Sequence, residues 1–120
     1  MPPPTPTRLV TVDRSKEKAN ALATSVIKAL QDKYHIVHVA NCTSIEAVNH
    51  VLSSFIREPD ILITSSEWFE EEQDEIRGIA QRVTPNVKLI MIPPGLAAQE
   101  GESKAAAYLK EQVVESGKLH

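Results

Sequence analysis

Residues 61–66 read Ile-Leu-Ile-Thr-Ser-Ser, and this stretch decides the fold class. Its first four residues are apolar or β-branched without interruption, whereas a strand with one face in water alternates apolar and polar residues. An uninterrupted run is typical of a strand in the middle of a parallel sheet, because helices cover both faces of such a sheet. The stretch therefore predicts a central strand in an α/β protein.

Strand and helix patterns alternate on both sides of this run. Further strands are predicted at residues 9–12, 35–40 and 87–92, and amphipathic helical patterns connect successive strands. Strong helix formers dominate from residue 97 onward, so a terminal helix is predicted over about 102–116. This alternation with short connections predicts a mostly parallel sheet with right-handed crossovers and helices on both faces.

Local signals place the ends of the first two helices. Ser15 or Asp13 is predicted to cap the first helix by accepting a hydrogen bond from a free backbone N–H. Thr43 and Glu46 have the spacing of a capping box at the start of the second helix. Pro59 is predicted to end that helix, because the residue before a proline disfavours helical geometry.

Length and composition fit one small domain. The chain has 120 residues, a formal net charge of −3 and 42% hydrophobic residues, and one hydrophobic core usually serves about 100–150 residues. Residues 1–8 hold four of the eight prolines and are predicted to be a disordered leader. Residues 9–120 are predicted to form a single domain.

The composition also argues against several classes of function. Basic residues are scattered among carboxylates, so no nucleic-acid partner is expected. No apolar run approaches the roughly 18–20 residues of a membrane helix, which predicts no membrane association and a cytoplasmic location, with the nucleus as an alternative. Cys42 is the only cysteine, and neither a metal nor a cofactor is expected. Its thiol is either reactive, because a helix begins nearby, or a small buried hydrophobic group.

The carboxyl ends of the predicted strands mark the candidate site, since ligands of open α/β sheets bind there. Asp13 and Arg14 follow the first strand, and Ser65 and Ser66 follow the third. One hypothesis is an anion pocket in which the guanidinium and hydroxyl groups bind a phosphate or carboxylate. The alternative is that Arg14 pairs with a nearby acidic residue and the serines cap the third helix.

An aromatic and acidic turn follows these serines. Trp68 and Phe69 precede a run of carboxylates that begins with Glu70 and Glu71. Aromatic residues flanked by charge are common anchors of protein interfaces, which predicts a protein partner at this turn. The alternative is that the aromatic rings close over a helix end.

Three segments resemble the receiver domains of two-component response regulators: LVTVDRS at 9–15, EPDILITSS at 58–66 and IRGIAQRVTPNVKLIMI at 76–92. The resemblance implies a three-layer, flavodoxin-like sheet of order 2-1-3-4, with Ala105–Leu109 as a possible short fifth strand. In that family a phosphoryl group is transferred to an aspartate after the third strand, with Mg²⁺ held by acids after the first. Ser65 stands at the aspartate position and Arg14 replaces one of the paired acids. The resemblance therefore implies a degenerate pseudo-receiver, which is a non-catalytic protein-interaction or regulatory module.

A second family resemblance and the edge of the predicted sheet give two further predictions. The segments PDILITS and TPNVKLI resemble, more weakly, the substrate-side domain of D-2-hydroxyacid dehydrogenases. That resemblance implies a small enzyme or a binding protein for an anionic metabolite at the strand ends. In addition, without a fifth strand the run at 87–92 would be an exposed edge. It is then covered by the terminal helix or by a second subunit, and the second case predicts a homodimer.

Overall fold

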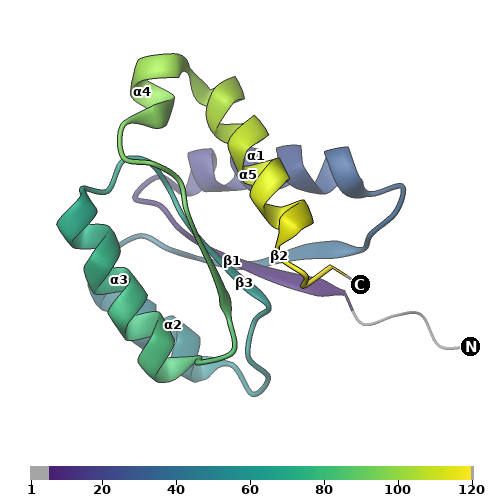
Figure 1. The fold of residues 1–120 in the computed structure, drawn as a ribbon. Helices are drawn as coiled ribbons and strands as arrows, with labels where there is room; N and C mark the ends of the chain where they lie inside the picture. Colours follow the sequence, from purple (N-terminus) through teal and green to yellow (C-terminus); the bar gives the residue numbers. More distant parts are fainter. Residues whose placement is uncertain (1–5, 120) are drawn as a thin grey trace, which may run out of the picture.

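The computed structural model describes residues 6–119 and contains a parallel sheet with the strand order β2-β1-β3-β4 (Figure 1). The four strands are β1 (Thr7–Val12), β2 (Ile36–Cys42), β3 (Ile61–Thr64) and β4 (Lys88–Met91). The predicted α/β class, parallel sheet and order 2-1-3-4 are confirmed. The strand β3 pairs on both sides, with β1 and with β4.

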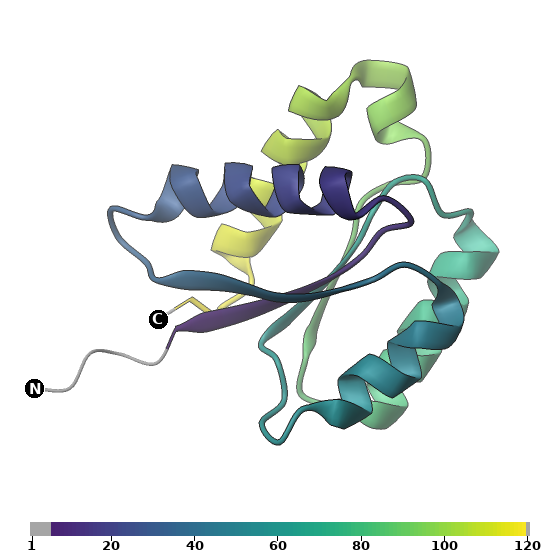
Figure 2. The same cartoon turned by 180° about the vertical axis from the view of Figure 1, so that it is seen from behind.

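Helices cover both faces of the sheet, so the fold has three layers (Figure 2). Helices α1 (Lys16–Leu30) and α5 (Glu102–Glu115) pack on one face. Helices α2 (Ile45–Ser54) and α3 (Glu70–Val83) pack on the other. The short helix α4 (Leu96–Glu100) lies between β4 and α5.

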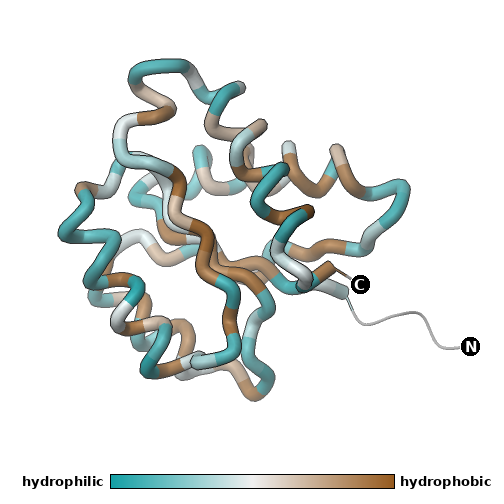
Figure 3. The backbone as a smooth tube through the Cα atoms, viewed as in Figure 1, coloured by the Kyte–Doolittle hydropathy of each residue, from teal (hydrophilic) through white to brown (hydrophobic). Residues whose placement is uncertain are grey.

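Alternating side chains of β3 divide between two aliphatic cores. Ile61 and Ile63 pack with α1 and α5, whereas Leu62 packs with α2 and α3. All three are at most 1% exposed. Successive side chains of a strand point to opposite faces, so a strand covered on both faces must be apolar at every position. Figure 3 shows the resulting concentration of hydrophobic residues along the strands.

The segment Ala105–Leu109 lies within α5, so the fifth strand that the receiver resemblance allowed is not formed. The predicted terminal helix over 102–116 is confirmed to within one residue. Ala105 and Leu109 are buried on the helix face that packs on the sheet and α1. Gly95 and Gly101, which precede α4 and α5, both have a left-handed φ, of 81° and 94°, a conformation that side chains disfavour.

The amino end of β1 corrects the predicted leader. Thr7 and Arg8, assigned to the leader at 1–8, pair with Ile36 and Val37 of β2. The Thr7 hydroxyl also donates a hydrogen bond to the carbonyl oxygen of Lys118 at 3.1 Å. The rest of that prediction, at residues 1–5, lies outside the described residues. The prolines predicted a disordered segment through residue 8, but strand β1 begins at Thr7, directly after the last of them.

The helix caps agree only in part with the predictions. Ser15 caps α1 by accepting from the Lys18 N–H, as predicted. Ser44, rather than Thr43, caps α2 and accepts from the Ala47 N–H at 3.2 Å. Helix α2 ends at Ser54, before the predicted stop at Pro59, because the chain becomes extended at the next residue.

Over the part of the chain that the structure describes, none of the helices combines the length and apolar character that a bilayer span requires.

Candidate functional site

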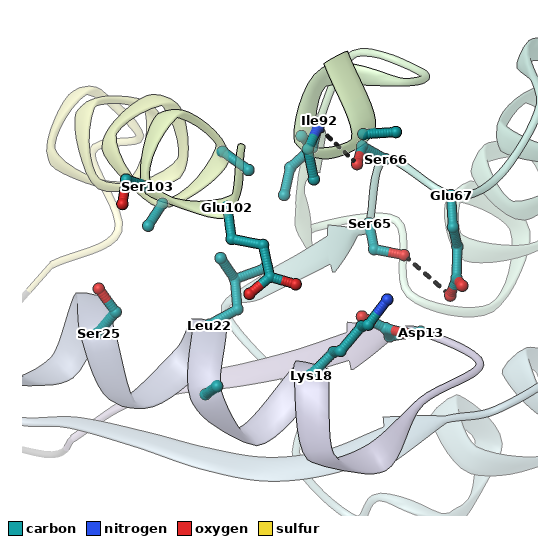
Figure 4. A pocket seen from close by; sticks show the side chains of 15 residues that line it. Asp13, Lys18, Leu22, Ser25, Ser65, Ser66, Glu67, Ile92, Glu102 and Ser103 are labelled. Carbon is teal, nitrogen blue, oxygen red and sulfur yellow. Dashed lines mark hydrogen bonds between the residues drawn. The ribbon is translucent and has the colours of Figure 1, made fainter. Parts of the chain in front are cut away.

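A pocket of about 420 Å³ opens at the carboxyl ends of β1 and β3, between α1 and α5 (Figure 4). Ligand pockets in α/β sheets form at this edge, where successive crossovers leave on opposite faces. Its apolar lining includes Leu22, Ile92, Ala97, Ala105 and Ala106. Its polar lining includes Asp13, Lys18, Ser65, Ser66, Glu67, Glu102 and Ser103.

Three of the four residues predicted for this site line the pocket, and Arg14 does not. The Arg14 guanidinium pairs with Glu72 at 3.0 Å and lies 4.5 Å from the centre of the Trp68 ring. The predicted anion pocket, which joined Arg14 to Ser65 and Ser66, is therefore wrong. The pairing of Arg14 with a nearby acid, which was the alternative, is the one observed.

Asp13 and Glu67 form a carboxyl pair in the lining of the pocket. Asp13 is 5% exposed. Burial raises the pKa of Asp13 to about 6, and its hydrogen bond with Glu67 acts in the same direction. Burial also works to raise the pKa of Glu67, but hydrogen bonds from Asp13, the Arg14 N–H and the Ser65 hydroxyl outweigh it and lower that pKa. When the pair holds a single proton, Asp13 is therefore the group that binds it.

This pair predicts a pH-dependent stability. The ordinary pKa of an aspartate is 3.8, so the folded state holds the Asp13 proton more tightly than the unfolded chain. The contribution of Asp13 to the free energy of unfolding should fall by roughly 2 kcal/mol as pH rises from about 4 to 6, and stay level above about pH 7. The lowered pKa of Glu67 opposes this effect only below its ordinary value of 4.5.

Urea unfolding of the wild type and Asp13→Asn, followed from about pH 4.5 to 8, measures this effect. The variant cannot titrate at this position, so its stability should change less across the window. An equal decrease in stability for both proteins would show that Asp13 does not hold the proton.

The two serines have different structural tasks. The Ser65 hydroxyl donates to Glu67 at 3.2 Å. The Ser66 hydroxyl oxygen accepts from the Ala97 N–H at 3.2 Å, and the Ser66 carbonyl accepts from the Gly95 N–H at 2.8 Å. Ser66 therefore fixes the start of α4 over the pocket, a role that differs from the predicted capping of the third helix.

Gln73 supports the pocket from the opposite face of the sheet, and the sequence analysis missed it. It is 4% exposed, and its side-chain amide donates to the carbonyl oxygens of Ile92 at 2.9 Å and Ser65 at 3.4 Å. It therefore joins the ends of β3 and β4. The signal was its spacing, because Gln73 shares a helix face with the buried Ile76 and Ala80.

Trp68 is buried, which corrects its prediction as a partner contact. Its side chain is 2% exposed, and its indole N–H donates to the carbonyl oxygen of Val12 at 2.9 Å. The ring closes the core beneath α2 and α3 at the end of β1, in the manner of the alternative prediction. Phe69, in contrast, is 69% exposed. Of the two aromatic residues, only Phe69 remains available to a partner.

Cys42 is a buried hydrophobic group. Its side chain is 1% exposed, and burial raises the pKa of the thiol to about 11. Because the thiolate is the reactive form, we expect no reaction of the native protein with dithionitrobenzoate at about pH 8. The same reagent should modify one thiol per chain after unfolding in guanidinium, which serves as the control. Rapid modification of the native protein would contradict the burial.

The acidic residues at the strand ends do not fit the Mg²⁺ site found in receiver domains. Mg²⁺ binds ionised carboxylates in an octahedral arrangement. The Asp13 carboxyl group is instead hydrogen-bonded to Glu67 and to the Ser15 N–H. Within residues 6–119 no group of three His, Cys, Asp or Glu side chains is placed to hold a metal ion.

No protein-family model matches the sequence, and no curated protein matches it significantly. The functional proposals below therefore rest on the geometry of the site.

Proposed function

We propose that this protein is a non-catalytic regulatory domain that binds a small molecule in the strand-end pocket. The observation that carries the proposal is the pocket itself, with its volume of about 420 Å³ and its combination of apolar and polar lining residues. Binding pockets of small molecules are concave and mostly apolar, with a few convergent polar groups that orient the ligand. The pocket lies where α/β sheets bind ligands.

The polar groups of the pocket favour binding over covalent chemistry. A nucleophilic serine needs a strong base within hydrogen-bonding distance. The partner of the Ser65 hydroxyl is Glu67, whose pKa is lowered by its hydrogen bonds despite burial, and this makes it a weak base. No histidine or cysteine is among the residues that line the pocket.

A variant that fills the pocket tests the proposal. Ala106 lines the pocket from α5 and is partly exposed, so Ala106→Phe should fold while occupying the cavity. Ala107 is exposed and does not line the pocket, and Ala107→Phe is the matched control. In a thermal-shift screen of small metabolites, a ligand at 100 times its dissociation constant stabilises by about 2.7 kcal/mol.

We expect the stabilisation to disappear in Ala106→Phe and to persist in Ala107→Phe. A ligand that stabilises all three proteins equally would bind elsewhere and would contradict the proposal. Absence of any stabilising compound across amines, carboxylates, phosphates and nucleotides would also count against a ligand-binding domain.

The exposed side chain of Phe69 supports a second candidate, a protein partner at the start of α3. Phe69 is 69% exposed, and the adjacent Glu70 and Glu71 are also exposed. An aromatic anchor with an acidic rim complements a basic surface that carries an apolar hollow. This proposal keeps the predicted partner surface of Phe69, Glu70 and Glu71 without Trp68.

Pull-down experiments with Phe69→Ala test the partner surface. A partner of this surface should be retained by the wild type, lost with the variant, and released as salt is raised from about 0.1 to 0.5 M. The Val114→Ala variant, which changes another exposed apolar side chain, is the control. Equal recovery of every partner by the wild type and Phe69→Ala would remove the surface from consideration.

The pseudo-receiver interpretation and the homodimer also remain proposals. The strand order 2-1-3-4 and the place of Ser65 at the end of β3 support the first. The position of β4 at the edge of the sheet supports the second, because an edge strand has unpaired backbone groups along its outer side. A monomeric mass at high protein concentration in light scattering would contradict the homodimer.

A further inference from the structure

Carboxyl groups face the strand-end pocket from three separate elements, whereas its lining contains a single cation. Asp13 follows β1, Glu67 lies in the loop after β3, and Glu102 opens α5. Lys18 of α1 is the one basic residue of the lining. Even with Asp13 protonated, Glu67 and Glu102 outnumber the Lys18 ammonium. The lining therefore carries a net negative charge at neutral pH.

The strongest hydrogen-bond acceptors of the lining are its carboxylates, and its donors are the Lys18 ammonium and the serine hydroxyls. Figure 4 shows the Glu102 carboxylate directed into the cavity, and within residues 6–119 it forms no salt bridge. The Ser65 hydroxyl proton is already donated to Glu67. Arg14, a second cation that follows β1, pairs with Glu72 and does not line the pocket. A ligand that donates hydrogen bonds fits this lining better than one that accepts them.

The apolar floor limits the rest of the ligand. Leu22, Ile92 and Ala105 form part of this floor, and Ala97 and Ala106 extend it toward α4 and along α5. Alanine side chains are short, so they leave room between the helices without supplying polar partners. The floor is suited to a small aliphatic group.

We propose that the pocket selects a small aliphatic compound with one ammonium group over an anion of the same size. This inference rests on the proposed function, because it specifies the ligand class of the same pocket. The ammonium group lies on the side of Glu102, and the aliphatic part contacts the apolar residues of the lining. Lys18 projects from α1, across the pocket from Glu102 (Figure 4). Its ammonium group repels a second positive charge on the ligand. A diamine should therefore bind more weakly than a monoamine.

Titrations of the isotope-labelled protein, followed by NMR, compare three probes of one shape: isobutylammonium, isobutyrate and isobutanol. We expect isobutylammonium to shift the amide signals of Leu22, Ser66 and Ala105, with an affinity at least about fivefold higher than that of isobutyrate. Glu102→Gln should weaken amine binding by about three- to fivefold, and Lys18→Gln should strengthen it. Glu111→Gln removes an exposed carboxylate of α5 outside the pocket and should leave the affinity unchanged.

The outcomes separate this inference from the proposed function. If isobutyrate or isobutanol shifts the same amides with equal or higher affinity, the charge selection is overturned while the pocket remains a ligand site. An unchanged amine affinity in Glu102→Gln also overturns it. If none of the probes shifts the pocket amides, and the wider thermal-shift screen is silent, both proposals fail.

Discussion

Replacement of Trp68 by alanine is expected to lower the free energy of unfolding by about 3–5 kcal/mol, the usual range for a buried tryptophan. Trp68 is among the largest fully packed side chains of the core. The change removes its contacts with the core beneath α2 and α3, and it also leaves the Val12 carbonyl without its indole donor. Urea denaturation followed by circular dichroism measures the loss.

Two variants separate the contributions to this loss. Trp68→Phe keeps an aromatic ring but removes the N–H donor, and we expect it to cost about 1–3 kcal/mol. Phe69→Ala changes the exposed neighbouring ring and should shift stability by less than about 1 kcal/mol. Similar losses for Trp68→Ala and Phe69→Ala would contradict the burial of Trp68. Because Trp68→Ala is expected to unfold a large fraction of the protein, Phe69→Ala is the suitable variant for partner binding.

Replacement of Gln73 by methionine is expected to cost about 1–3 kcal/mol. Methionine has a similar length and packs well in a core, but it has no donor for the carbonyl oxygens of Ser65 and Ile92. The Ser65 and Ile92 carbonyl groups directly follow β3 and β4 at the edge of the pocket. Without their shared donor, the ends of the two strands should be held together less firmly. Hydrogen exchange of the Ser66 and Gly95 amides, both near this junction, should become faster.

Gln81→Met provides the matched control for this change, because Gln81 belongs to the same helix and is exposed. We expect its effect to lie within about 0.5 kcal/mol. If Gln73→Met were as stable as Gln81→Met, the amide of Gln73 would not support the strand ends.

The layered fold was predictable because its signals are local and repeated. The run Ile61–Thr64 has no polar interruption, and the structure buries it between two helical layers. The abundance of strong helix formers likewise identified α5, whose alanines argue against a fifth strand. The start of β1 was missed because Thr7 and Arg8 are polar and follow prolines, and their strand pairing depends on β2, which is distant in the sequence.

The candidate site was predictable in position but not in chemistry. Strand ends placed Asp13, Ser65 and Ser66 at one edge, and they do line one pocket. The sequence did not reveal the orientation of Arg14, because its salt bridge is with Glu72 in another helix. Nor did it show that Glu102 reaches the pocket, because this depends on how α5 packs against α1. Both orientations decide the charge of the lining, which is net negative, whereas an anion pocket needs a positive one.

The hydrogen bond between Thr7 and Lys118 has a consequence for protein engineering. It brings the two ends of the described chain together at the amino edge of the sheet (Figure 1). The pocket opens at the opposite end of β1. A strand of this length separates the two edges by roughly 20 Å. Domains whose ends lie side by side tolerate insertion into a surface loop of another protein. This domain is therefore suited to insertion into a loop of a reporter protein, with the junction at the edge of the sheet opposite the pocket.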